Sequence, residues 1–318
     1  MTIDFEIVKW IIFTLGILSL LMVDLGVFHK KSKVMSKKEA LSWCVVWVTL
    51  ALAYGGFVYW WKGERTAVEY ISGYLIELSL SVDNMFVFIL IFQYFKVPPE
   101  YQHRVLFWGI LGAMILRGVM IALGAALIAQ FDWILYVFGV FLIYTGIRMA
   151  LQDEQGVEPD KNPMVGLTKR IFPVTKRFYG EHFFIRRRGF MAATPLFVVL
   201  QVINFTDVVF ALDSIPAIFA ITLDPFVVFT SNVFAILGLR SLYFALHGMM
   251  DSFHYLKYGL AGVLSFIGMK MLLGHTQWAI PLGWALATVA AMLALSVIAS
   301  LVFPRKSHTA PHHHEHQD

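Results

Sequence analysis

The sequence predicts an all-α polytopic membrane bundle of about nine transmembrane helices, built on a three-plus-three inverted repeat. Of its 318 residues, 58% are hydrophobic and only 14% are charged, whereas soluble domains carry about 25% charged residues. The chain also contains many apolar runs of the roughly 20 residues that one membrane crossing requires. These runs lack the alternation of strands, and lipid permits only helices or closed barrels. Helices are therefore expected.

The apolar runs predict nine crossings. We expect them at about 7–28, 41–61, 71–95, 104–129, 133–151, 193–221, 227–247, 255–273 and 279–303. The first lacks the basic start and the small-residue cleavage site of a secretory signal peptide, so we expect it to be retained. Cys44, the one cysteine, lies in the second run. It can form neither an internal disulfide nor a cysteine metal cluster.

Basic residues predict the orientation of the chain. Lysines and arginines gather in the connections 29–40 and 152–192, which nine crossings place on the same side. Short basic loops favour the cytoplasm, so we expect an outside N-terminus and a cytoplasmic C-terminus. The formal net charge of +4 is read as this topology signal rather than as a nucleic-acid surface, because the basic loops lack interleaved aromatic residues.

A weak internal repeat divides the chain. Phe131–Tyr136 resembles Phe253–Tyr258, and Gly146–Met149 resembles Gly268–Met271 at the same offset. Each repeat has three crossings, so the second would be inverted, which is a transporter architecture; chance likeness between apolar helices is the alternative. The expected units are two N-terminal helices with a basic loop (1–70), the first repeat (71–151), a basic cytoplasmic loop (152–192), the inverted repeat (193–273), and a last helix with a His-rich tail (274–318).

Two acidic motifs lie inside apolar spans. Glu77 and Asp83 are six residues apart in the third span, and Asp207 and Asp213 are six apart in the sixth. An isolated carboxylate within a membrane costs several kcal/mol. A cation, a proton, a basic side chain or a water-filled cavity must therefore compensate for each acid.

Helix geometry sets a condition on these motifs. Six residues turn an ideal helix by about 600°, so the two acids of a motif point about 120° apart. We expect local unwinding to bring them together, as in transporters with broken helices, and Pro216 would leave the carbonyl of Leu212 without its helical donor. The further candidate ligands are the carbonyl of Leu212 and the side chains of Asn84, Asn204 and Ser214.

The proposed ligands are all oxygens, which favours Mn²⁺, Mg²⁺ or Ca²⁺ over Zn²⁺ or Cu⁺. Carboxylates in a low-dielectric site can also exchange protons for a cation, so proton-coupled antiport is chemically available. The alternative is that the acids pair with Arg117 and Arg240, which lie mid-span in the two halves, and hold the bundle together. In a compromise, each arginine balances one acid and the remaining acids bind the ion.

The roles of several other polar residues can be interpreted in two ways. Asp24 in the first span is either a gate residue or an interfacial acid, and Asp132 is expected to be an interfacial loop acid. The tail His312–His316 could bind metal, although an incidental unstructured tract is favoured.

Three strings resemble the TerC family of bacterial membrane proteins: Asp24–Lys30, Ser81–Asn84 and Phe210–Ala217. The resemblance extends over about 20–275. It implies a bacterial inner-membrane exporter that lowers cytoplasmic Mn²⁺, with Glu77, Asp83, Asp207 and Asp213 matching the family's functional acids. One departure concerns Asn204, because relatives typically have an acid three residues before the position of Asp207. Asparagine keeps an oxygen ligand but loses a charge.

We therefore expect export of a divalent cation, preferably Mn²⁺, by alternating access around the four acids. The expected partners are the lipid bilayer and the transported metal ion, with no nucleic acid and no permanently bound cofactor. A membrane-assembly or metal-stress complex component is the alternative. An intramembrane aspartyl protease is a remote one, since Phe210–Asp213 departs from the Gly-x-Gly-Asp context of that class; we expect no enzymatic activity.

Overall fold

A computed structural model of the chain describes residues 2–28, 36–131, 133–151, 162–187, 190–246, 255–274 and 276–302. For residues 2–6, 23–28, 83, 187 and 301 it describes the backbone alone. The elements are α1 (Thr2–Phe28), α2 (Lys37–Lys62), α3 (Glu64–Tyr94), α4 (Pro99–Gln130), α5 (Ile134–Leu151), α6 (Pro163–Ile171), β1 (Phe184–Arg187), β2 (Phe190–Ala193), α7 (Pro195–Phe219), α8 (Pro225–Leu237), α9 (Leu239–Leu246), α10 (Leu256–Leu273) and α11 (Leu282–Val302).

The all-α membrane bundle is confirmed. Within the described residues, eight helical segments are long and apolar enough to cross a membrane: α2, α3, α4, α5, α7, Pro225–Leu246, α10 and α11. They correspond to eight of the nine expected crossings. The remaining one falls on α1, whose described apolar stretch, Ile7–Met22, is shorter than the other eight.

The seventh expected crossing is divided into two helices. α8 ends at Leu237 and α9 begins at Leu239, and the N–H of Gly238 between them bonds to the carbonyl of Ile236. Nearly all of this segment is buried inside the protein, with 89% of its most apolar stretch enclosed. It is therefore the inner element of the bundle.

The expected unwinding at the acidic motifs is wrong. α3 runs without a break through Glu77 and beyond the first motif, and α7 runs without a break through both acids of the second. Pro216 lies inside α7 but only one turn before its end, and the N–H of Ala220 bonds to the Pro216 carbonyl. The proline therefore removes a single helical bond near the C-terminus, and the helix stays regular at Asp207 and Asp213.

The connection expected as a basic loop contains secondary structure within its described residues, from 162 on. It contains α6, which is capped by the Asn162 side chain accepting from the N–H of Met164 at 2.9 Å. An antiparallel hairpin of β1 and β2 follows, with Phe184 paired to Ala193 and Arg187 to Phe190. Short polar elements give weak periodicity, which explains why the pattern of the sequence missed them.

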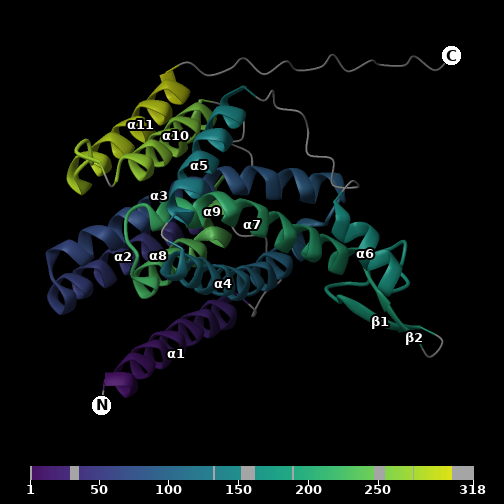
Figure 1. The fold of residues 1–318 in the computed structure, drawn as a ribbon. Helices are drawn as coiled ribbons and strands as arrows, with labels where there is room; N and C mark the ends of the chain where they lie inside the picture. Colours follow the sequence, from purple (N-terminus) through teal and green to yellow (C-terminus); the bar gives the residue numbers. More distant parts are fainter. Residues whose placement is uncertain are drawn as a thin grey trace.

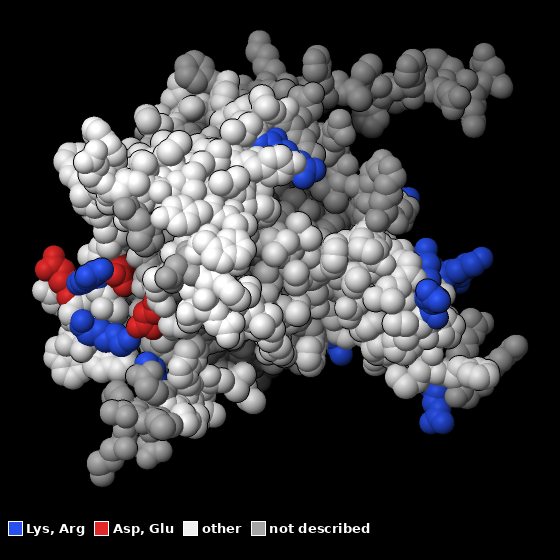
Figure 2. Space-filling view, in the orientation of Figure 1, with Lys and Arg blue, Asp and Glu red and all other residues white. Residues whose placement is uncertain are grey.

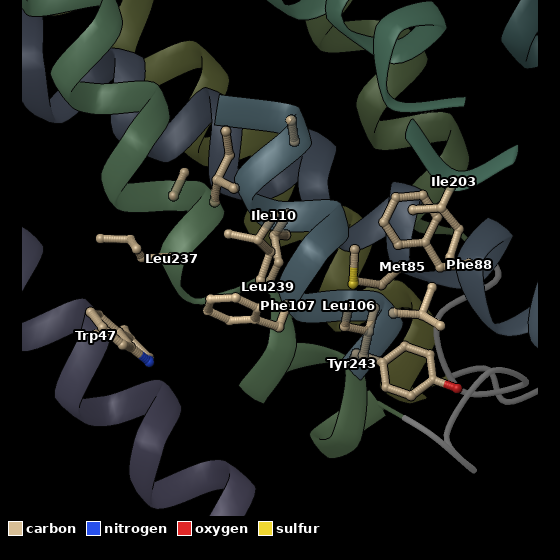
Figure 3. Close-up of a cluster of buried hydrophobic side chains, with 14 of the residues drawn as sticks. Trp47, Met85, Phe88, Leu106, Phe107, Ile110, Ile203, Leu237, Leu239 and Tyr243 are labelled. Atoms are coloured by element: carbon tan, nitrogen blue, oxygen red, sulfur yellow. The ribbon is translucent and has the colours of Figure 1, made fainter. Parts of the chain in front are cut away.

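The helices pack around a centre formed by α3, α4, α7 and α8. α3 contacts α8 and α7, and α4 contacts α7, while α5, α10 and α11 lie together along another side (Figure 1). Figure 3 shows how side chains from several helices fill the core, including Trp47 from α2, Phe88 from α3 and Leu106 from α4. Tyr243 of α9 joins this core, and its hydroxyl donates to the Gln102 side chain at 2.8 Å.

Candidate functional site between α3, α4 and α7

A buried arginine joins the two acidic motifs. Arg117 of α4 is 1% exposed. Its Nε and Nη2 donate to the two carboxylate oxygens of Asp207 at 3.0 and 2.9 Å. Its Nη1 donates to Glu77 Oε1 and, at 2.9 Å, to Oδ1 of Asn232 on α8. One guanidinium therefore holds α3, α7 and α8 together by charge-assisted bonds.

The charges in this network do not balance when both acids are ionised. Glu77 and Asp207 are buried, and among the described residues the one cation that pairs with either of them is Arg117. Two carboxylates against one guanidinium leave one negative charge over. Glu77 Oε2 is buried and has no hydrogen-bond partner, so it is the oxygen of the network that remains open to a further ligand.

Buried polar groups other than the two acids lie along α3 and α7. On α3, Ser81 and Asn84 follow Glu77 at helical spacing, and both are buried. On α7, Asn204 precedes Asp207 by three residues and Ser214 follows it by seven. The buried Asn204 Oδ1 and Ser214 Oγ lack hydrogen-bond partners. The helices that meet at Arg117 thus present a row of oxygens rather than two isolated acids.

Asn204 is packed tightly against α4. An added Cβ at Gly112 would lie 2.7 Å from Asn204 Oδ1 and 2.9 Å from its Nδ2. Real side chains do not approach so closely, so the amide position depends on a glycine at residue 112. Below it, a small cavity of about 10 Å³ adjoins Asp207, which is enough for roughly one water molecule.

Asp213 lies apart from the Arg117 network. It is partly buried, and the side chains that act on its carboxylate are Thr145 and Arg148 of α5. α5 packs against α7. Because α7 is regular, Asp207 and Asp213 face different neighbours, as the angle of about 120° between them requires.

Charged residues also gather where α2 meets α3 and α7 meets α8, at one end of the bundle (Figure 2). Lys62 binds Asp224 at 2.7 Å, and Glu69 accepts from the Thr222 hydroxyl at 2.7 Å. Burial alone would raise the pKa of Asp224, but the Lys62 ammonium and the N–H groups of Phe226 and Val227 outweigh it and lower the pKa. These contacts tie the two connections together outside the spans.

Comparison with known proteins identifies the family. A family model described as "Integral membrane protein TerC family" matches residues 62–308. The chain belongs to the TerC family. This TerC-family chain is 48% identical over 302 residues to "Uncharacterized membrane protein STKORF319" of Myxococcus xanthus, covering 95% of this chain and 94% of the relative. No solved structure matches it.

Two enterobacterial relatives carry a name. Proteins called "Putative membrane-bound redox modulator Alx" are 45% identical over 300 residues in Salmonella typhi and 46% identical over 301 residues in Escherichia coli K12. In both cases the alignment covers 91% of this chain and 92% of the relative. The resemblance read from the motifs is confirmed, and the TerC-family chain is a multi-pass membrane protein like its bacterial relatives.

The structure brings some of the predicted site residues of this TerC-family protein together. Glu77, Asp207 and Arg117 form one network, whereas Asp213 lies outside it. Among the described residues, no three His, Cys, Asp or Glu side chains lie close enough to hold a metal ion. The side chains of Asp24 and Asp83 are outside the described part of the chain, as are Asp132 and the histidine tail.

Other predicted residues have distinct environments. Arg240 is buried in α9, and the side chain of Leu212 is 48% exposed on the outer face of α7. Sequence reasoning missed Asn232, although an amide within the apolar run of α8 is a signal that could have found it. It also missed Thr145 and Arg148, which only the packing of α5 on α7 brings to Asp213.

Proposed function

We propose that this TerC-family protein transports divalent cations and exports Mn²⁺ from the cytoplasm by alternating access. The ion would be handled by the intramembrane acids Glu77, Asp83, Asp207 and Asp213. One observation carries the proposal: Glu77 and Asp207 are buried inside the bundle with more negative than positive charge in contact. Uncompensated carboxylates at this depth are costly and mark ion or proton pathways.

The available ligands favour a hard cation. The polar groups that line α3 and α7 near Arg117 are carboxylates, hydroxyls and amides. Oxygen ligands suit Mn²⁺, Mg²⁺ and Ca²⁺, whereas Zn²⁺ and Cu⁺ prefer nitrogen or sulfur. The choice of Mn²⁺ among the first three, and the direction of transport, rest on family resemblance.

In this proposal, Arg117 determines which of the acids remain charged and available to the ion. The guanidinium neutralises one of the two charges that Glu77 and Asp207 carry, and the charge that remains attracts a cation or a proton. Asp213 lies outside this network and faces Thr145 and Arg148 of α5, so it would meet the ion at another point of the path. Movement of the ion between these positions would need a rearrangement of α5 against α7.

The packing of the helices supports an inverted repeat. α5 and α10 have the same length, 18 residues, and Ile134 and Leu256 begin them 122 residues apart. At their crossing, an added Cβ at Gly139 would lie 3.0 Å from the carbonyl oxygen of Gly268. An added Cβ at Gly146 would lie 2.7 Å from that of Ala261.

A shift of 122 residues exchanges these two contacts, because it takes Gly139 to residue 261 and Gly146 to Gly268. This is what a two-fold relation between antiparallel helices would produce. α3 with α8 and α7 with α4 are likewise exchanged by the repeat, and both pairs are in contact. We infer nine crossings including α1, with the N-terminus outside, C-terminus in the cytoplasm and the bacterial inner membrane as the location.

The alternatives are weaker. The relatives are named for redox modulation, but this chain has one cysteine and cannot form an internal dithiol couple. We propose no enzymatic activity, since Asp207 is bound through both of its carboxylate oxygens by Arg117 and a protease dyad would need two acids sharing a proton.

Proteoliposomes containing the purified protein test the proposal. Flux of Mn²⁺, Ca²⁺, Mg²⁺ and Zn²⁺ is measured with and without a pH gradient. We expect protein-dependent Mn²⁺ flux that exceeds Zn²⁺ flux and responds to the gradient. If the flux of each of the four ions equals that of empty liposomes, the transport function is refuted.

A further inference from the structure

A basic groove lies outside the bundle, in the segment that connects the two halves of the chain. The groove has a volume of about 650 Å³ and lies between residues 173–179 and strand β2. Its lining residues are Pro173, Val174, Thr175, Lys176, Arg177, Tyr179, Phe190 and Ala192. Backbone bonds of 2.9 Å from Thr175 N to Ala193 O and from Ala193 N to Pro173 O hold the two walls together.

The segment around this groove is strongly basic. The described residues 162–187 include five basic residues with exposed side chains and a single acid, Glu181. The five are Lys169, Arg170, Lys176, Arg177 and Arg186. Glu181 is itself bound by Arg104 of α4 at 3.1 Å, so it does not offset the basic residues that line the groove.

The segment is fixed against the end of the transmembrane bundle. The Phe184 and Phe197 rings lie 4.4 Å apart, and the Arg104 guanidinium lies 5.5 Å from the centre of the Phe183 ring. Strand β2 ends at Ala193, and α7 begins two residues later at Pro195. Figure 1 shows α6 and the hairpin projecting from one end of the bundle, where Figure 2 shows basic side chains.

Apolar side chains around the groove are exposed. Phe190, which lines it, is 72% exposed, and its neighbour Met191 is 58% exposed. On α6, Ile171 and Leu167 are 59% and 45% exposed. Exposed apolar side chains beside arginines and lysines are typical of segments that lie in the headgroup region of a membrane.

We propose that this groove binds the headgroup of an anionic phospholipid from the leaflet that surrounds the bundle. Lys176 and Arg177 supply the cations for the phosphate, and arginine matches phosphate oxygens by paired hydrogen bonds. Phe190, which lines the groove, contacts the glycerol and the upper acyl chains, and the exposed side chains of Ile171 and Leu167 lie on the neighbouring α6. A soluble phosphate would leave these apolar side chains in water, so charge and apolar exposure together favour a lipid.

Native mass spectrometry of the purified full-length chain tests this site. The protein is released from nanodiscs that contain equal amounts of phosphatidylglycerol and phosphatidylcholine with the same acyl chains, and retained lipids are counted. We expect phosphatidylglycerol to be retained in preference. In the double variant Lys176→Gln with Arg177→Gln, this retention falls several-fold; both residues are exposed, so the fold is not expected to change.

The matched control is Lys37→Gln with Lys38→Gln, which removes the same charge from exposed positions in the first turn of α2. It should retain phosphatidylglycerol like the wild type. Equal losses in the two double variants would mean a general charge effect and would overturn the site, as would retention without lipid preference. If soluble glycerol phosphate displaces the retained lipid at similar concentration, the groove is a free-anion site and the lipid assignment is wrong.

Discussion

Asp207 and Asp213 lie six residues apart on one regular helix, yet their environments differ. Asp207 is buried and bound through both oxygens by Arg117, whereas Asp213 is partly buried and faces Thr145 and Arg148 of α5. The same residue type, about 9 Å further along the same helix, can thus lie inside a fixed ion pair or beside a neighbouring helix.

The difference teaches that the acidic motifs need not act as a single cluster. One acid from each motif, Glu77 and Asp207, links the central helices through Arg117. A buried ion pair costs desolvation that only good geometry repays, and here the bidentate contact with Asp207 supplies it. We infer that this network holds the central helices together and keeps one uncompensated negative charge for the ion, while Asp213 meets the ion at another point of its path.

Removing Arg117 should have the largest effect on stability. Arg117→Ala would leave two buried carboxylates without their cation, which typically costs about 3–5 kcal/mol. We expect little folded protein in the membrane and a large fall in the melting temperature in detergent. Adding Glu77→Gln and Asp207→Asn to Arg117→Ala should restore folded protein in part. Wild-type amounts of the single variant would contradict a structural role for the network.

Crowding the crossing of α5 and α10 should have the next largest effect. In Gly268→Ala the new Cβ would lie 2.6 Å from the carbonyl oxygen of Gly139, and such overpacking costs about 1–3 kcal/mol. Gly56→Ala in α2 is the control, because its Cβ would have nothing within 4 Å. Melting temperatures should fall only for Gly268→Ala; equal values for both variants would argue against a close crossing.

Asn204 gives a finer test of the network. Because Gly112 leaves no room around the amide, Asn204→Asp is the substitution that adds a charge without adding length. The extra charge beside Asp207 should lower the half-saturating Mn²⁺ concentration several-fold and shift the pH dependence of flux. Unchanged values for both would place residue 204 outside the ion path.

The surface pair of Lys62 and Asp224 should have the smallest effect, about 1 kcal/mol or less. The pKa of Asp224 is lowered from its usual 3.8 in the folded protein. The stability that the Lys62–Asp224 pair contributes is therefore fully present above the ordinary pKa of 3.8 and is lost as the pH falls through the lowered pKa of the folded protein. The melting temperatures of wild type and Asp224→Asn should differ at neutral pH and converge on acidification. A difference in melting temperature between the two proteins that widens below pH 4 would contradict this prediction.

The helix positions and the intramembrane acids could be predicted from the sequence, because both depend on the local composition of the chain. Apolar runs placed the eight membrane-spanning segments to within about seven residues at each end, and the carboxylates of Glu77 and Asp207 stood out because they lie in apolar surroundings. Arg117 was already an alternative partner for them. Such signals are local, so they can be read without knowing how the helices pack.

The remaining features depend on packing or on weak patterns. Which acids meet Arg117 follows from the rotation of α3 and α7 about their axes, which the sequence does not specify. Unwinding was expected so that the two acids of each motif could converge, but both helices stay regular, and Pro216 lies only one turn before the end of α7. The hairpin β1–β2 is too short for a clear alternation, and the contact of α5 with Asp213 is a tertiary one.

Mn²⁺ flux through Asp213→Asn in proteoliposomes tests the central claim most directly. The variant keeps the size of the side chain and leaves the Arg117 network intact, so we predict a wild-type melting temperature with flux reduced to that of empty liposomes. Asp224→Asn, which removes the same charge outside the spans, should transport at the wild-type rate. Wild-type flux through Asp213→Asn would contradict the proposed role of Asp213 as an acid that handles the ion outside the Arg117 network.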